Sequence, residues 1–128
     1  MSFILLRDGM IQAVHGEICA RHGGRTGLRE NSMLKMLYAR AQVLNQSSAT
    51  DLAALAACYG YGLAHDQLFH AANLPTALVV IELVLTLNGY RLTADDTTCF
   101  LGLMVVAQGE LGAEAFASWI RNHIAPIG

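Results

Sequence analysis

Apolar residues recur along most of this chain at the three- and four-residue spacing that is typical of helices. The clearest run lies at i, i+3, i+4, i+7 and i+11 and consists of Leu52, Leu55, Ala56, Tyr59 and Leu63. These positions share one face of a helix. Similar runs, bounded by glycine, proline and capping residues, predict six helices. We expect them at about residues 9–22, 31–41, 51–64, 75–88, 94–107 and 113–123.

The ends of these helices carry start signals. Asp51, or Thr50 before it, is expected to cap the third helix, and Thr93 the fifth. Pro75 suits the first turn of the fourth helix. That helix is apolar nearly all round, which predicts a central, buried position for it.

The order of elements predicts an all-α fold. Phe3 to Leu6 is a short apolar stretch, and a short N-terminal strand is one option there. A chain of 128 residues suits one domain, and no long linker or internal repeat divides it. We therefore expect a single domain over residues 1–128, built as a helical bundle of about six helices.

The composition narrows the classes of partner. Hydrophobic residues make up 54% of the chain and charged residues 14%, and the net charge is −2. The basic residues are scattered, which argues against a nucleic-acid surface. A surface so poor in charge favours self-association, and we expect a homo-oligomer. The longest apolar run, 77–87, contains Glu82 and is too short to span a bilayer, so we expect no membrane partner.

The three cysteines, Cys19, Cys58 and Cys99, are far apart and odd in number. None has a nearby Cys or His at the spacing of a metal site. Reduced thiols in a cytoplasmic protein are the simpler interpretation, and we expect no metal site.

The stretch HDQLFHAANLPT, residues 65–76, joins two apolar helices and suggests an anion site. The first N–H groups of a helix are unpaired, and its dipole favours negative charge. Ala71 and Ala72 are small enough for a ligand to approach the backbone. Asn73 suits a helix cap, a ligand or both. Leu74 and Pro75 stand where a cation would be useful.

Segments on both sides of this loop resemble the Doc (death on curing) branch of the Fic family. The similar stretches cover nearly the whole chain and are His22-Gly23-Gly24, Gly27-Leu28-Arg29, Leu37 to Gln42, Tyr59 to Ala64, Thr76-Ala77-Leu78, Leu87 to Tyr90, Val105 to Leu111 and Trp119-Ile120-Arg121. The resemblance implies a Fic/Doc-type helical bundle. It also implies transfer of a phosphoryl or nucleotidyl group from ATP, with Mg²⁺, to a protein hydroxyl. Doc acts in this way on elongation factor Tu, as the toxin of a toxin–antitoxin pair.

The loop of this chain departs from the family pattern at its chemical positions. The positions that shape the loop are similar and are Phe69, Ala72 and Asn73. We expect Phe69 to be buried as the anchor of the loop, because an aromatic between two helices contributes core area. The family's histidine base corresponds to Gln67, its metal-holding acid to Ala71, and its two cations to Leu74 and Pro75. The resemblance therefore implies a degenerate phosphate loop, for which we expect no cofactor.

Other residues are candidates for the missing chemistry. Glutamine is no general base near neutral pH, so Gln67 can only orient a hydroxyl. His65 and His70 are alternative bases, although each also suits a surface or capping histidine. Asp66 is either a metal ligand or a solvated carboxylate. Glu82 either points outwards or is buried with a partner such as an arginine or a backbone group, and we favour pairing over catalysis.

The first functional hypothesis is a catalytically inactive Doc homologue that binds proteins, such as an antitoxin or the family's protein target. The second is an active transferase with an altered motif, in which His65 or His70 is recruited. The third is a protein that binds a small ligand in the same cleft.

Overall fold

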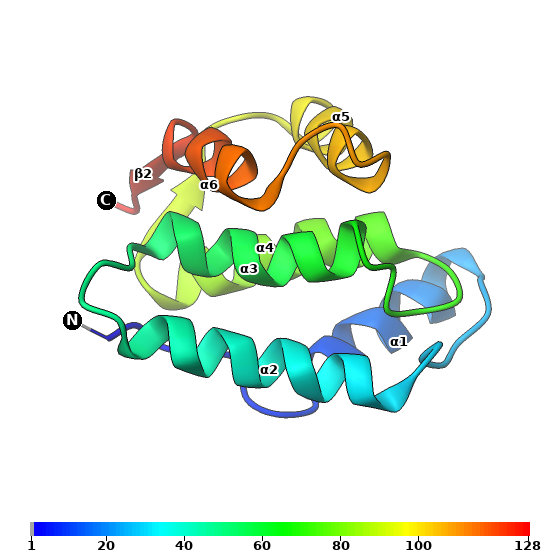
Figure 1. The fold of residues 1–128 in the computed structure, drawn as a ribbon. Coiled ribbons are helices and arrows are strands. Elements are labelled where there is room, and N and C mark those ends of the chain that lie inside the picture. Colours follow the sequence, from blue (N-terminus) through cyan, green and yellow to red (C-terminus); the bar gives the residue numbers. More distant parts are fainter. Residues whose placement is uncertain (1) are drawn as a thin grey trace.

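The computed structural model describes residues 2–128 and contains six helices and two short strands (Figure 1). The elements are α1 (Met10–His22), α2 (Asn31–Gln46), α3 (Leu52–Ala64), α4 (Asn73–Leu87), β1 (Tyr90–Leu92), α5 (Asp96–Ala107), α6 (Ala113–Arg121) and β2 (Ile124–Pro126). The predicted number and order of helices are confirmed. The molecule is mostly helical, with a small sheet that the helical spacing did not predict.

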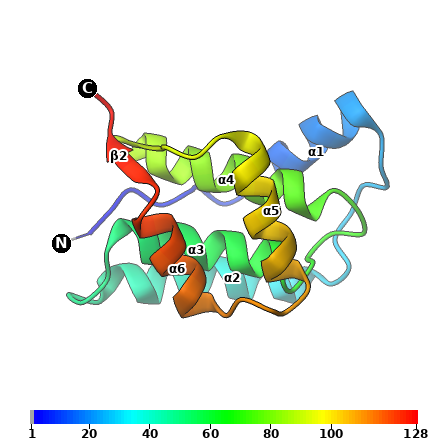
Figure 2. The same ribbon diagram turned by 90° about the horizontal axis from the view of Figure 1, so that it is seen from above.

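The centre of the molecule is the pair α3 and α4. α3 packs against α4, α6 and α2, which surround it in two perpendicular views (Figures 1 and 2). Ten of its 13 residues are buried, against seven of 15 in α4. The central position expected for the fourth helix is thus shared, and α3 is the more deeply buried of the two.

Two glycines inside α3 allow this close packing. A Cβ at Gly60 would lie 2.5 Å from the Ile81 side chain on α4, and one at Gly62 would lie 2.8 Å from Leu37 on α2. Glycine costs helix stability, but here the missing side chains make room for the neighbouring helices.

Several helix ends differ from the expected residues. Asp51 caps α3 by accepting the Ala54 N–H at 2.9 Å, as predicted. Thr93 is not the cap of α5, because the helix begins only at Asp96. The Thr93 N–H instead donates to the His123 carbonyl and extends the pairing of the strands. Asp95 caps α5 instead, through the Thr98 N–H at 2.8 Å.

The N-terminal segment is extended but forms no strand. The Asn45 amide bonds both the N–H and the carbonyl of Phe3, at 2.8 and 3.0 Å. Asn88 does the same for Ile4, at 2.7 and 3.0 Å. These two side chains satisfy the backbone groups that a neighbouring strand would otherwise pair.

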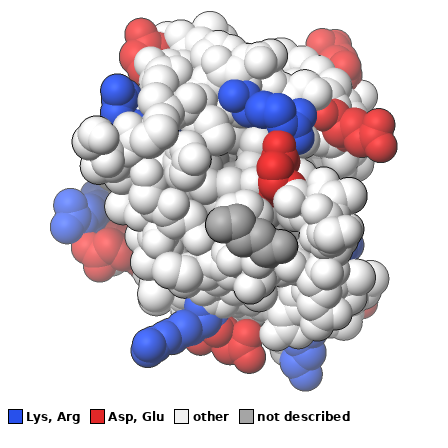
Figure 3. Space-filling view, turned by 90° about the vertical axis from the view of Figure 1, so that its left-hand side faces the viewer, with Lys and Arg blue, Asp and Glu red and all other residues white. Residues whose placement is uncertain are grey.

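The small sheet joins the end of α4 to the C-terminus. β1 and β2 are antiparallel, with Tyr90 opposite Pro126 and Leu92 opposite Ile124. Both termini lie on this side of the molecule, where charged side chains are scattered over a largely uncharged surface (Figure 3). Within residues 2–128 no helix has both the length and the apolar character needed to cross a membrane.

Candidate functional site

The α3–α4 loop is fixed by backbone contacts with the segment between α1 and α2. Leu28 and Phe69 form an isolated antiparallel bridge. The Arg29 N–H donates to the Leu68 carbonyl at 2.8 Å, and the His70 N–H donates to the Gly27 carbonyl at 3.3 Å. Both connections lie at one end of the bundle, opposite the termini (Figure 1). The loop is therefore held in place by backbone hydrogen bonds to residues 27–29.

Asn73 closes the loop on itself. Its side-chain oxygen accepts the Phe69 N–H at 3.0 Å, and its amide group donates to the Phe69 carbonyl at 2.9 Å. The prediction that Asn73 caps the helix is wrong, because Asn73 is already the first residue of α4 and Ala72 precedes it as N-cap. The predicted start at Pro75 is likewise two residues late. Pro75 is the third helical residue, where its missing N–H removes no intrahelical bond.

Two residues of the loop have left-handed backbone conformations. The φ angle is 50° at Gln67 and 60° at Ala72. Such angles cost residues other than glycine about 1–2 kcal/mol each. Ala72 turns the chain into α4, and no side chain caps the free N–H groups that follow. This geometry is that of an anion site at a helix N-terminus.

Phe69 anchors the loop to α1. It is buried, and its ring stacks on that of His15 with centroids 3.7 Å apart and an angle of 7° between the planes. His15 Nε2 also lies 2.9 Å from the Ala71 carbonyl, to which it donates. The Cys19 sulfur lies 3.5 Å from Nε2 and 3.9 Å from Nδ1. When Nε2 donates to Ala71, only Nδ1 is free to accept the thiol. The loop thus rests on a buried aromatic and imidazole pair.

The role of His15 was not predicted from the sequence. A polar residue at a position that shares the buried face of α1 with Ile11 and Cys19 was the available signal. Contact with the loop depends on how α1 packs, and the spacing along α1 does not reveal it.

Gln67, Ala71, Leu74 and Pro75, the positions at which the resemblance implied chemical groups, carry none of that chemistry. Gln67 is exposed, and its carbonyl accepts the Arg29 guanidinium at 3.2 Å. Ala71, Leu74 and Pro75 are half-buried and have no ionisable group. These residues do not fit ATP with Mg²⁺, which needs a carboxylate for the metal and cations for the phosphates. Within residues 2–128 no three His, Cys, Asp or Glu side chains cluster as metal ligands.

The two alternative bases are placed differently. His65 Nδ1 lies 2.9 Å from the Asp66 carboxylate, and the His65 ring stacks on Tyr61 with centroids 4.6 Å apart. Asp66 is therefore paired with a histidine, and not simply solvated as one interpretation had it. His70 is exposed, and no hydrogen bond holds its ring within the described part of the chain. Of the two, His65 has the orienting carboxylate that general bases commonly use.

Glu82 does not form the ion pair that we favoured. It lies on the exposed side of α4, and within residues 2–128 no cation lies within ion-pair distance of it. Partial burial of the Glu82 carboxylate, and after it the nearby Asp96 carboxylate, raise the pKa of Glu82. The outward-pointing interpretation is the one that the geometry supports.

The cysteines are all free. Cys19 and Cys99 are buried, and Cys58 is half-buried on α3. Burial raises the pKa of the Cys58 and Cys99 thiols, so neither is an activated nucleophile.

Comparison of the sequence with protein-family models and with curated proteins finds no match. The site is therefore interpreted from its own geometry: a fully built loop at a helix N-terminus, without the groups that phosphoryl transfer requires.

Proposed function

We propose that this protein is a Doc-like homologue that is inactive in phosphoryl and nucleotidyl transfer and acts by binding another protein. One observation carries the proposal. The loop has an anchored aromatic, a closing asparagine and an open helix N-terminus, while Gln67, Ala71, Leu74 and Pro75 supply no base, metal ligand or cation. A loop that has this structure but lacks the catalytic groups favours a binding role over catalysis.

The candidate partners follow from the same resemblance: a small antitoxin, or elongation factor Tu as the family's target. A purified complex with the product of an adjacent gene, or saturable binding of elongation factor Tu in calorimetry, would support the binding role.

The inactive assignment is tested by inducing the protein in growing cells and by incubating it with extract and ATP carrying a labelled α- or γ-phosphate. We expect no growth arrest and no labelled protein band. Gln67→His alone should stay inactive, since a base contributes roughly a hundred- to ten-thousand-fold only when the phosphate is already held.

Repair of all four positions is the matched positive variant. Gln67→His, Ala71→Asp, Leu74→Lys and Pro75→Arg together restore a base, a metal ligand and two cations. We expect label transfer from this variant alone, because groups that act as one unit recover little singly. Label transfer by the unmodified protein, or by Gln67→His, would overturn the proposal.

One observation favours a second candidate, an active transferase with a relocated base. The His65 ring is oriented by Asp66 at 2.9 Å, as in acid–base pairs of known enzymes. If the unmodified protein labels a target, His65→Gln should abolish the labelling and His70→Gln should not.

A further inference from the structure

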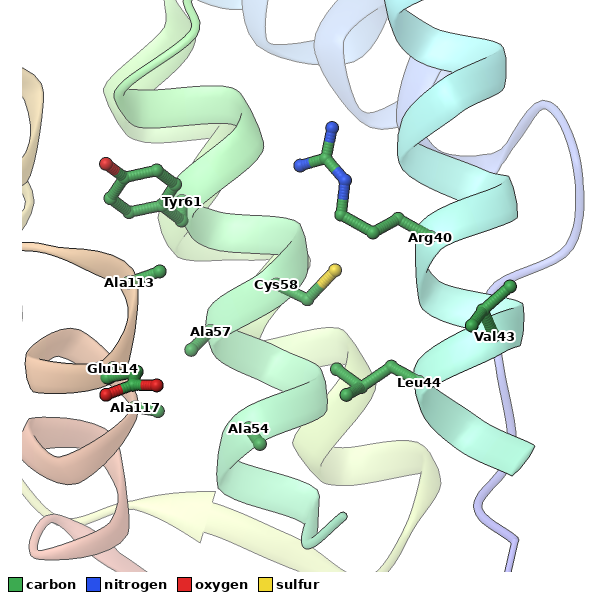
Figure 4. Close-up of a pocket in the computed structure, with 10 residues that line it drawn as sticks. All are labelled: Arg40, Val43, Leu44, Ala54, Ala57, Cys58, Tyr61, Ala113, Glu114 and Ala117. Carbon is green, nitrogen blue, oxygen red and sulfur yellow. The ribbon is translucent and has the colours of Figure 1, made fainter. Parts of the chain in front are cut away.

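An apolar groove of about 350 Å³ lies between α2 and α6, and no residue of the α3–α4 loop lines it (Figure 4). Its floor is the outer face of α3, where Ala54, Ala57 and Cys58 present small side chains at helical spacing. Val43 on α2 and Ala117 on α6 form parts of the two walls. The groove thus runs over the outer face of α3 and is flanked by α2 and α6.

The α2 wall is also an exposed apolar ridge. Met36 is 58% exposed and Val43 is 70% exposed. Val43 follows Met36 by seven positions, which is about two turns, so both lie on one face of α2. Exposed apolar strips on a chain so poor in charge mark interaction surfaces. A groove and a ridge therefore lie side by side on the same helix.

The two walls carry opposite charges. Arg40 extends from α2 and Glu114 from α6, on opposite sides of the α3 floor (Figure 4). Within residues 2–128 neither forms an ion pair. In a two-fold dimer the contact between two residues is made twice. Arg40 of each copy can therefore face Glu114 of the other.

We propose that the groove is filled by α2 of a second copy of this chain. Across the dimer interface the order of helices is then α6, the partner's α2, α2 and the partner's α6. Each Val43 ridge enters the other copy's groove, and Arg40 meets the partner's Glu114. The small floor side chains permit the close approach of helices that pack ridges into grooves. A small apolar ligand would fill the groove but would leave the Val43 ridge exposed.

The first test is the mass in solution, measured by sedimentation equilibrium over a range of concentrations. We expect a dimer that Val43→Glu converts to a monomer. Leu101→Glu is the matched control, because Leu101 is likewise an exposed apolar residue, at 58% against 70% for Val43, but lies on α5, outside the groove. A monomer at every concentration, or a dimer lost with Leu101→Glu and not with Val43→Glu, would overturn the proposal.

Charge reversal tests the pairing directly. Arg40→Glu and Glu114→Arg should each weaken the dimer by roughly tenfold or more, because like charges then face each other. The double variant should recover most of the loss. Two single variants that leave the dissociation constant unchanged would contradict the arrangement.

The reaction rate of the Cys58 thiol shows whether the groove is covered, independently of the mass in solution. Cys58 is the half-buried thiol of the groove floor, whereas Cys19 and Cys99 are buried. A thiol reagent should modify Cys58 slowly in the dimer and quickly in Val43→Glu, and Cys58→Ser should remove the fast reaction. Equal rates in the dimer and in Val43→Glu would show that the groove is open, against the proposal.

Discussion

At the scale of single residues, Phe69 joins the loop to α1. It is 3% exposed and stacks on His15. Phe69→Ala should lower the free energy of unfolding by about 3 kcal/mol or more, because it leaves a cavity and removes the stack. Urea unfolding followed by circular dichroism measures the change.

Phe69→Leu is the control, since leucine keeps most of the apolar volume and loses only the aromatic contact. It should cost clearly less than Phe69→Ala. A Phe69→Ala variant with unchanged unfolding would mean that the side chain does not anchor the loop.

The left-handed backbone at Ala72 makes a second prediction. With φ at 60°, alanine carries a strain that glycine lacks. Ala72→Gly should raise the free energy of unfolding by about 0.5–1 kcal/mol, after the larger entropy of the unfolded glycine chain is subtracted.

The control for this change is Ala77→Gly inside α4, where the backbone is helical and the residue is fully buried. There glycine should destabilise by about 1 kcal/mol. If thermal unfolding shows both substitutions to be destabilising, the backbone at Ala72 is unstrained.

At the scale of elements, Asp51 links the start of α3 to the end of α6. It caps α3 and pairs with Arg121, whose Nη2 is 2.9 Å from Oδ1. The Arg121 guanidinium holds the pKa of the Asp51 carboxyl below its usual range. The stability from this pair is therefore present above about pH 4 and is lost as the pH falls through the lowered pKa.

Asp51→Asn keeps the cap and removes the charge. At pH 7 it should be less stable by about 1 kcal/mol or less, because the pair is exposed to solvent. Melting temperatures of the two proteins should converge as the pH falls below 4. A difference that stays constant from pH 7 to pH 3 would contradict the ion-pair account.

The N-terminal segment depends on α2 and on the residue after α4. Asn45 and Asn88 each bond both backbone groups of one residue in it. Arg7 is already exposed, and Asn88→Ala should speed trypsin cleavage after it, because Ile4 loses both partners and the segment is held less firmly. Asn122→Ala is the control, since Asn122 lies at the exposed end of α6. Equal cleavage of the two variants would show that Asn88 does not hold the segment.

At the scale of the whole molecule, the absence of fitting groups at the loop predicts how nucleotides behave. ATP with Mg²⁺ should show no saturable micromolar binding in calorimetry, since the dipole and N–H groups of α4 supply only modest attraction. The four-residue repair variant should bind more tightly. Micromolar affinity of the unmodified protein would show that the loop needs neither cations nor a carboxylate.

Part of the candidate site was predictable from the sequence and part was not. Phe69 as a buried anchor followed from an aromatic between two apolar helices, and the burial confirms it. The positions of His65 and His70 relative to partners were not predictable, because adjacent residues in a turn point in directions that the backbone angles set. Asn73 was misassigned for the same reason: its bonds return to Phe69 once Ala72 adopts its left-handed angle.

The sequence by itself determined the helices and most of their ends, because spacing, glycine and capping residues act within a few positions of one another. Gly23, Asp51 and Asn88-Gly89 mark ends that the structure retains. Only the tertiary structure decided the contacts between distant segments. It paired β1 with β2, set His15 beneath the loop, and left the groove between α2 and α6 open. These features depend on how helices pack around α3. Packing brings together residues far apart along the chain, and the spacing of apolar residues within each helix does not show which distant residues will meet.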